Sequence, residues 1–133
     1  LAVAQQNAMH HGVADRFTTV CGDLFAPFPL PTHSRWDLIV SNPPYIAASD
    51  YPHLMPEVQR EPKRALLAGD GLDFYRRILR QAGDYLTHHG RLALEMGYGQ
   101  LQQIRRLIPP NLAEERVVGD FAGIERVIIL ALA

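Results

Sequence analysis

Hydrophobic positions along the 133-residue chain recur with two different periods, which separates predicted helices from predicted strands. Apolar residues three or four apart predict helices over residues 1–12, 71–90 and 98–108. The first two of these segments end at a glycine and the third ends at a proline pair, both typical helix stops. Continuous or β-branched apolar runs predict strands over residues 16–23, 36–42, 91–97, 113–120 and 125–133.

The order of these segments predicts the fold class. Strands alternate with helices through most of the chain, which is typical of an α/β fold with a largely parallel sheet. The run Leu38 to Val40 is continuously aliphatic, so we expect the strand over residues 36–42 to be buried on both faces. A link of four residues, 121–124, joins the last two strands and requires them to be antiparallel.

Residues 43–70 form a long stretch without either period, and prolines at positions 52, 56 and 62 interrupt it. Loops longer than about 12–15 residues are uncommon in compact domains and tend to be functional or disordered. We therefore expect this segment to contribute to function.

Composition narrows the function classes. The formal net charge is −1, without the basic excess of a dedicated nucleic-acid binder. The apolar end, residues 127–133, is too short to span a membrane, and no His/Cys set has metal-ligand spacing. The single cysteine, Cys21, cannot form an internal disulfide and fits a reducing, cytoplasmic location. The first residue is Leu1 in an uncapped helix, so we expect the chain to be the downstream part of a longer protein.

The stretch Asn42-Pro43-Pro44-Tyr45 directly follows a predicted strand and is the main candidate for chemistry. Proline fixes its own φ and holds the preceding residue extended, so the prolines make this corner rigid. The Asn42 side-chain oxygen and the proline carbonyls are hydrogen-bond acceptors, and the Tyr45 ring offers a flat face. The corner therefore suits a planar group that carries an NH₂.

A second polar residue, Asp23, follows the predicted strand over residues 16–23. Ligands of open α/β sheets bind beyond the carboxyl ends of the strands, so we expect Asp23 and Asn42 to open onto the same sheet edge. A Gly-Asp pair is also common turn chemistry, and Glu57, Glu61 and Glu95 are interpreted as structural or solvent-facing rather than catalytic.

The motif DLIVSNPPYI resembles the signature of class I S-adenosylmethionine-dependent methyltransferases that act on planar nitrogens. Further blocks are similar to the N(5)-glutamine methyltransferases of peptide chain release factors. They are GDLF (22–25), PEVQREPKRALLAGDGLDFYRRIL (56–79), GRLALEMGYGQ (90–100) and DFAGIERVII (120–129). The resemblance covers essentially the whole chain. It implies a Rossmann-like sheet, mostly parallel with an antiparallel last strand and lacking the family's first strands, in the C-terminal part (1–133) of one catalytic domain.

The resemblance also implies roles for individual residues. Asn42 and Pro43 would grip the amide of the GGQ glutamine with Pro44 and Tyr45 beside it, and catalysis would rest on Asn42, Pro43 and Tyr45. Asp23, Leu24 and Asn42 would contribute to the S-adenosylmethionine site, without a metal. The family's glycine-rich turn and its ribose-binding acid lie upstream of the first predicted helix, so we expect these 133 residues alone to bind cofactor weakly and to leave a sheet edge beside residues 36–42 unpaired.

Three alternatives stay open. A ribosomal-protein glutamine methyltransferase shares nearly every motif. An adenine-N6 or cytosine-N4 nucleic-acid methyltransferase would grip the exocyclic amine of a flipped base, although the near-neutral charge disfavours nucleic acid as the direct substrate. A catalytically silent fragment is the third.

Overall fold

The computed structural model describes residues 1–28 and 35–133, and the chain divides into two compact units, Leu1–Leu30 and Pro31–Ala133. Among the described residues, no helix combines the length and the apolar character that crossing a membrane requires.

The first unit contains helix α1 (Ala2–His10) and the 3₁₀ helix η1 (Ala14–Arg16). Helix α1 ends as predicted before Gly12, whose φ of 65° lies in the left-handed region that glycine tolerates. The strand predicted over residues 16–23 is wrong, because the described part of this unit forms no strand. Phe17 is extended, with φ −122° and ψ 120°, but an extended segment becomes a strand only when a partner supplies ladder hydrogen bonds.

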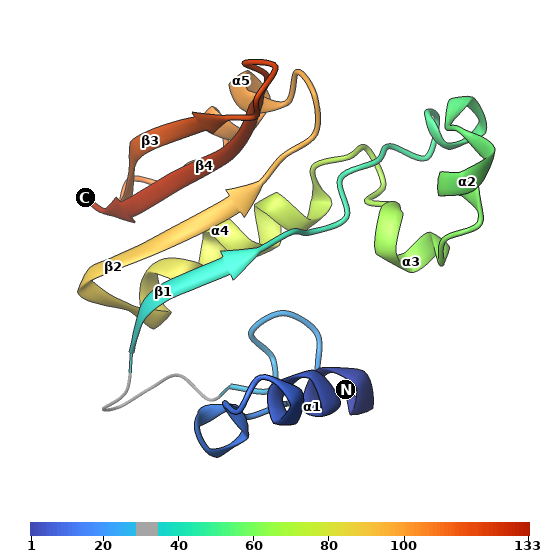
Figure 1. Cartoon of the computed structure of the whole chain (residues 1–133). Coiled ribbons are helices and arrows are strands. Elements are labelled where there is room, and N and C mark those ends of the chain that lie inside the picture. Colours follow the sequence, from blue (N-terminus) through green and yellow to red (C-terminus); the bar gives the residue numbers. More distant parts are fainter. Residues whose placement is uncertain (29–34) are drawn as a thin grey trace. The chain divides into compact units, whose positions relative to one another are not determined.

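The second unit is built around a four-stranded sheet of order β1-β2-β4-β3 (Figure 1). Its strands are β1 (Trp36–Ser41), β2 (Leu86–Glu95), β3 (Leu112–Gly119) and β4 (Glu125–Leu132). Strands β1 and β2 are parallel, whereas β4 is antiparallel to both of its neighbours, β2 and β3. Three strands therefore run in one direction and β4 opposes them, which confirms the predicted α/β sheet with an antiparallel last strand, although the strand predicted over residues 16–23 is not part of it.

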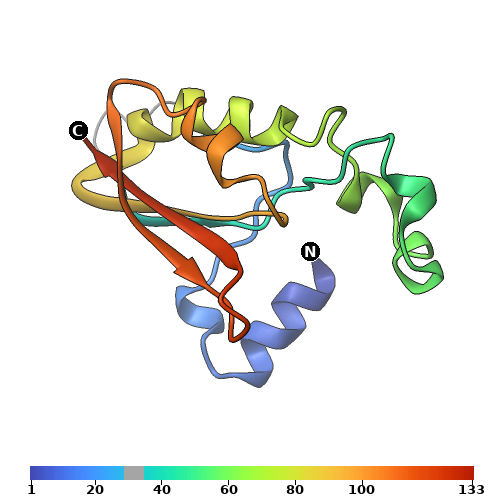
Figure 2. The same cartoon turned by 90° about the horizontal axis from the view of Figure 1, so that it is seen from above.

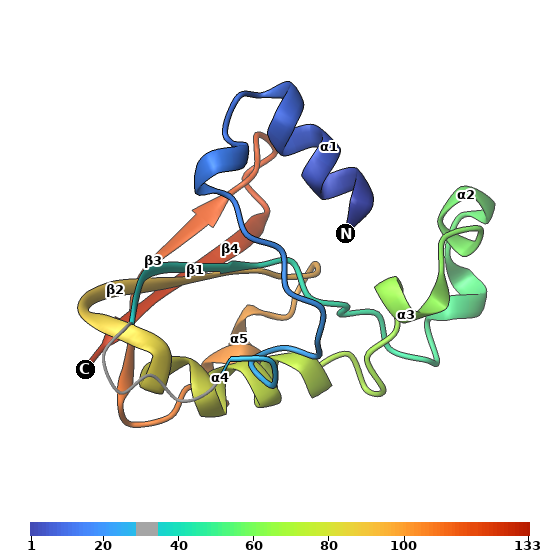
Figure 3. The same cartoon turned by 90° about the horizontal axis from the view of Figure 1, so that it is seen from below.

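Helices α4 (Asp73–Tyr85) and α5 (Leu101–Arg105) lie on one face of this sheet (Figures 2 and 3). Helix α4 is amphipathic and buries a continuous stripe against the sheet. The fully buried core of this unit comes from α4 and the central strands: Tyr75, Ile78, Leu79, Leu92, Leu94, Ile128 and Leu130.

Strand β1 lies at an edge of the described sheet and pairs there with β2 alone. Leu38 and Val40 share one face of the strand and are 59% and 70% exposed, so the predicted burial of both faces is wrong. The helices α4 and α5 lie together on a single face of the sheet (Figure 2), which leaves the other face of β1 without a helix from the described part of this unit.

Helix α4 ends at Tyr85, five residues before the predicted stop at Gly90, and β2 begins at once. The pairing register passes from Trp36↔Leu86 to Leu38↔Arg91, so β2 bulges over residues 87–90. A Cβ at Gly90 would lie 2.7 Å from the Trp36 carbonyl oxygen and 3.0 Å from the Thr87 nitrogen. Glycine is therefore needed for a close approach of two backbones rather than to end a helix.

The helix predicted over residues 98–108 is also shorter, because α5 covers Leu101–Arg105 alone. Gly99 has φ 74° and forms part of the turn that precedes the helix. After Arg105 the backbone hydrogen bonds span three residues instead of four, with Leu107 N donating to Ile104 O at 2.9 Å, before the proline pair.

Residues 43–70 carry three short helices, η2 (Tyr51–His53), α2 (Pro56–Gln59) and α3 (Lys63–Leu66). This segment projects beyond the carboxyl end of β1 (Figure 1). Tyr51 OH donates to Gln59 O at 2.9 Å, and Gln59 Nε2 donates to Leu54 O at 2.7 Å. These bonds give the predicted irregular stretch a defined local structure.

Candidate functional site

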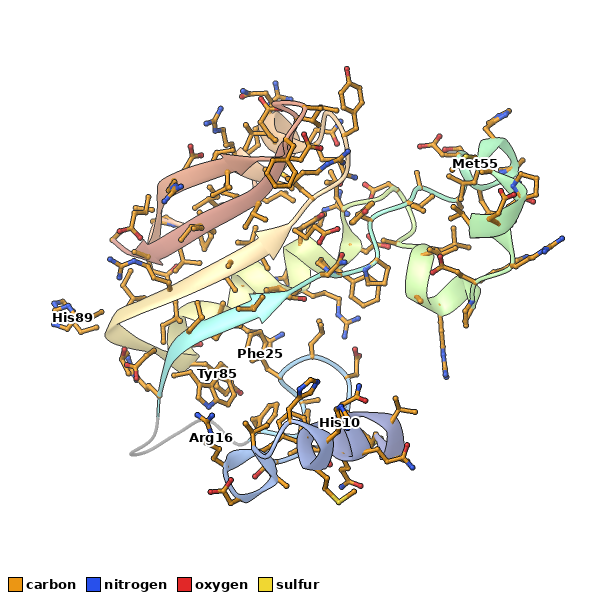
Figure 4. The ribbon with its side chains drawn as sticks, viewed as in Figure 1. His10, Arg16, Phe25, Met55, Tyr85 and His89 are labelled. Carbon is orange, nitrogen blue, oxygen red and sulfur yellow. The ribbon has the colours of Figure 1, made fainter. Side chains whose placement is uncertain are left out.

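The candidate site lies at the carboxyl edge of the sheet, where β1 and β2 end side by side. Asn42 follows the last residue of β1, and Ser41 pairs with Leu94, one residue before the end of β2 at Glu95. Figure 4 shows Met55 in the segment that projects from this edge and His89 at the opposite end of the sheet, in the bulge of β2. The position agrees with the rule that open α/β sheets bind ligands beyond the carboxyl ends of their strands.

A pocket of about 260 Å³ opens beside the corner Asn42–Tyr45. Its first wall consists of the corner and Ile46, and its second wall comes from the α2–α3 segment: Val58, Glu61, Ala65 and Leu66. Asn42 is exposed, Pro43 is buried, and Pro44 and Tyr45 are half-buried. The structure therefore brings all four predicted substrate-binding residues to one pocket.

The two walls are tied together by backbone hydrogen bonds. Ile46 N donates to Leu66 O at 2.9 Å, and Ala68 N donates to Ile46 O at 3.0 Å, which forms a parallel bridge between Ile46 and Leu67. Ala48 N donates to Gly69 O at 2.9 Å one step further along. The distance across the pocket is consequently set by main-chain contacts rather than by mobile side chains.

The corner Asn42–Tyr45 has carbonyl oxygens that can accept hydrogen bonds from a ligand. Within the described residues, no hydrogen bond ends on the carbonyl oxygen of Pro43 or Pro44. The carbonyl of Tyr45, in contrast, accepts a bond from Gln100 Nε2 at 3.0 Å. Asn42 and Pro43 can thus offer oxygen acceptors to a ligand, whereas the Tyr45 backbone is already held.

The Tyr45 hydroxyl lies beside charged side chains. Burial and the neighbouring Glu95 carboxylate raise the pKa of Tyr45, and Arg126 opposes the shift. The hydroxyl therefore stays protonated at neutral pH and can act as a hydrogen-bond donor. The ring packs closely on Gly97, because a Cβ there would lie 3.0 Å from Tyr45 Cδ2.

Sequence reasoning missed several residues at this site. Glu61 lines the pocket and is exposed to solvent as predicted, and Glu95 lies beside Tyr45, but the sequence pattern assigned neither residue to the site. Gln100 was not predicted to belong to the site, although its side chain donates a hydrogen bond to the Tyr45 carbonyl. The length of the segment over residues 43–70 was the available signal for Val58 and Glu61, since long loops in compact domains tend to be functional.

Asp23 and Leu24, the predicted cofactor residues, belong to the first unit, so their meeting with Asn42 stays a prediction. Asp23 does not follow a strand as expected, since none forms there. Leu24 has φ 51°, an uncommon conformation for a residue with a side chain. Among the described residues, no group of three or more His, Cys, Asp or Glu side chains is arranged to hold a metal ion.

Comparison with curated proteins places the chain beside glutamine methyltransferases. The release factor glutamine methyltransferase of Geobacter sulfurreducens is 43% identical over 131 residues, covering 96% of this chain and 44% of that protein. The protein of the same name from Cereibacter sphaeroides is 45% identical over 96% of this chain and 46% of its own length. The ribosomal protein uL3 glutamine methyltransferase of Bradyrhizobium diazoefficiens is 48% identical over 75% of this chain and 31% of its own length.

The resemblance predicted from the motifs is therefore confirmed, and the chain spans less than half the length of these curated relatives. No protein-family model matches the chain.

Solved structures show the fold. TrmN from Thermus thermophilus matches 99% of this chain and 33% of its own with a TM-score of 0.63 at 21% identity. The ribosomal protein L11 methylase of Lactobacillus delbrueckii subsp. bulgaricus matches 98% of this chain and 51% of its own with a TM-score of 0.62 at 16% identity. The sheet and its helices are thus those of a Rossmann-like methyltransferase fold.

Proposed function

We propose that this chain carries the methyl-acceptor site of a protein-glutamine N5-methyltransferase, with the GGQ glutamine of peptide chain release factors as the favoured substrate. The pocket between Asn42–Ile46 and the α2–α3 segment carries the proposal, together with 43–45% identity to relatives of that name. Under this proposal both units belong to one catalytic domain, and the activity is cytoplasmic, where translation takes place.

The size of the pocket favours a single planar group. Its volume of about 260 Å³ lies below the ~300–1,000 Å³ of sites that enclose a whole drug-sized ligand. A glutamine side chain is one such group, and it carries two N–H bonds. The Asn42 side-chain oxygen and the Pro43 carbonyl, on which no hydrogen bond from the described residues ends, are two acceptors on the same wall that can take these bonds.

Orientation is the main contribution that these residues make to the chemistry. An amide nitrogen is a weak nucleophile, because its lone pair is delocalised into the carbonyl. Two acceptors on its N–H bonds aim the nitrogen at the methyl carbon and stabilise the positive charge that builds there as the new bond forms. The extra proton can leave to water after transfer, so no carboxylate base is needed in the pocket.

S-adenosylmethionine is the implied methyl donor, and when bound it supplies an electrophilic methyl on a sulfonium. The chemistry of Asp23 and Leu24 fits the adenine of this cofactor, since a carboxylate accepts from an exocyclic amine and a leucine packs on a ring. Asn42 is proposed to contact both the substrate and the cofactor. No metal takes part in the proposed step.

A second candidate substrate is ribosomal protein uL3, favoured by the 48% identity to a relative named for it. Both candidates present a glutamine amide to the same corner, so the chemistry is shared and the protein partner differs. A nucleic-acid amine is disfavoured by the net charge of −1.

The test uses the protein expressed from its complete gene, methyl-labelled S-adenosylmethionine, and three acceptors: a release factor, uL3 and an oligonucleotide. We expect label on the release factor glutamine, located by peptide mass spectrometry. Asn42→Ala should abolish transfer while largely preserving cofactor binding in calorimetry. Ser49→Ala, which removes an exposed hydroxyl from the same segment, is the matched control. Label on the oligonucleotide alone, or near-normal turnover of Asn42→Ala, would overturn the proposal.

A further inference from the structure

We infer that Gln100 is a positioning residue for the corner Asn42–Tyr45, holding it in place through the backbone of Tyr45 and the glycines at positions 71 and 97. Its effect on methyl transfer rests on the proposed function. Gln100 directly precedes α5, outside the pocket, and its side chain joins three segments that are distant in sequence.

The amide nitrogen of Gln100 provides the donor arm. Gln100 Nε2 donates to Tyr45 O at 3.0 Å and to Gly71 O at 3.3 Å. Tyr45 is the last residue of the corner that follows β1, whereas Gly71 lies two residues before α4. One NH₂ group therefore links the end of the corner to the turn that leads into the main helix of the unit.

The amide oxygen of Gln100 provides the acceptor arm. Gly97 N donates to Gln100 Oε1 at 2.9 Å, and Tyr75 OH lies 3.4 Å from the same oxygen. Tyr75 is fully buried and also donates to Glu95 O at 2.8 Å. These partners determine the orientation of the amide, because a flipped Gln100 would point its NH₂ at the Gly97 N–H and its oxygen at two carbonyls.

The two glycines allow this approach. A Cβ at Gly71 would lie 3.0 Å from Tyr45 O and 3.1 Å from Gln100 Nε2. A Cβ at Gly97 would lie 2.9 Å from Gln100 Oε1 and 3.0 Å from Tyr45 Cδ2. Any side chain at either position would push Gln100 or Tyr45 away, so the close packing of backbone, ring and amide depends on both glycines.

The connection to the reaction is geometric. Only Pro43 and Pro44 separate Tyr45 from Asn42, and prolines transmit a displacement because their φ angles are fixed. If the Tyr45 carbonyl moves, the Asn42 oxygen and the Pro43 carbonyl move with it. A misplacement of about 1 Å in a positioning group can reduce a rate by about 100-fold.

The test compares three variants in the protein expressed from its complete gene. Gln100→Glu keeps an oxygen acceptor for Gly97 N–H but places a carboxylate against the Tyr45 and Gly71 carbonyls. Gln100→Ala removes both arms. Gln103→Ala, at an exposed glutamine of α5 three residues further along the chain, is the matched control.

We expect kcat of Gln100→Glu and Gln100→Ala to fall by at least about 10-fold while KM changes by less than about 3-fold, because the corner acts on the transition state. Gln103→Ala should stay within about 2-fold of the wild type on the same scale. In hydrogen exchange, the Gly97 amide should lose protection in Gln100→Ala and keep it in Gln100→Glu. If Gln100→Ala fails to fold, Gln100→Glu carries the test.

A crystal structure of Gln100→Glu separates this inference from the proposed function. If the wild type methylates no glutamine, the proposed function fails, and the displacement of Asn42–Tyr45 in that structure alone decides the positioning role. A corner that superposes on the wild type would overturn the inference, as would a kcat for Gln100→Glu equal to that of Gln103→Ala.

Discussion

A glycine can be needed for a left-handed backbone or for the close approach of two backbones, and substitutions at Gly90 can distinguish these two roles. The sequence pattern predicts that Gly90 is the left-handed stop of a helix. The structure places Gly90 in the bulge of β2, against the backbone of β1. Asparagine tolerates the left-handed region better than alanine, so a true helix stop would accept Gly90→Asn more readily than Gly90→Ala. A close backbone approach reverses that order, because the larger side chain collides more.

The magnitude follows from the distances. A Cβ at Gly90 would lie 2.7 Å from Trp36 O, whereas ordinary van der Waals contact begins at 3.4 Å. Both obstacles, Trp36 O and Thr87 N, are backbone atoms, so the strands themselves must separate. Overpacking of this kind costs about 1–3 kcal/mol, and we expect Gly90→Ala in that range with Gly90→Asn at least as costly.

The assay is urea unfolding followed by the fluorescence of Trp36, the single tryptophan, which stacks on Tyr85 with ring centroids 5.4 Å apart. Unchanged m-values with lower midpoints would report a loss of native stability. Gly123 is the control, because its φ is 78° and no atom of the described residues lies within 4 Å of a Cβ there. At Gly123 we expect alanine to cost about 1–2 kcal/mol and asparagine less. A Gly90→Asn variant more stable than Gly90→Ala would refute the reasoning.

Three further predictions concern the core and the charges of the second unit. Tyr75→Phe should cost about 1 kcal/mol in urea unfolding, because the bond to Glu95 O at 2.8 Å is lost, and an unchanged midpoint would contradict this. Leu92→Ala should cost about 2–5 kcal/mol in the same assay, because Leu92 is fully buried, and a loss below about 1 kcal/mol would count against its role in the core. The hydrogen bond from Arg76 lowers the pKa of Asp70 from 3.8 to about 2, so its stabilisation is full above pH 3.8 and lost as pH falls through about 2. Arg76→Gln should therefore lower the thermal midpoint at pH 6 and converge with the wild type near pH 2, and an equal difference at both pH values would contradict this.

The architecture of the second unit was largely predictable, because its signals are local. The short link over residues 121–124 leaves β3 and β4 no alternative to an antiparallel pair, and the helical period of residues 73–85 appears directly as α4. In the first unit the end of α1 was predictable for the same reason, because the left-handed backbone that ends this helix requires only the glycine at position 12.

The failures share a non-local cause. Residues 16–23 have strand composition, but a strand also needs a partner, and the described part of the first unit contains none. Leu38 and Val40 are as aliphatic as a strand buried on both faces requires, yet burial depends on what covers each face. The composition of a segment determines which secondary structure it prefers, but it does not determine which other segments pack against it.

The candidate site likewise combines features that the sequence determines locally with features that depend on contacts between distant segments. By itself the sequence determined the rigid corner Asn42–Tyr45, because two prolines restrict the backbone locally, and it determined that this corner follows a strand. Only the tertiary structure decided that Glu61 faces the corner across a pocket and that Gln100 holds Tyr45 from 55 residues away. Hydrogen bonds and close contacts between distant segments exist only once the sheet has brought its strand ends together, so no local pattern encodes them.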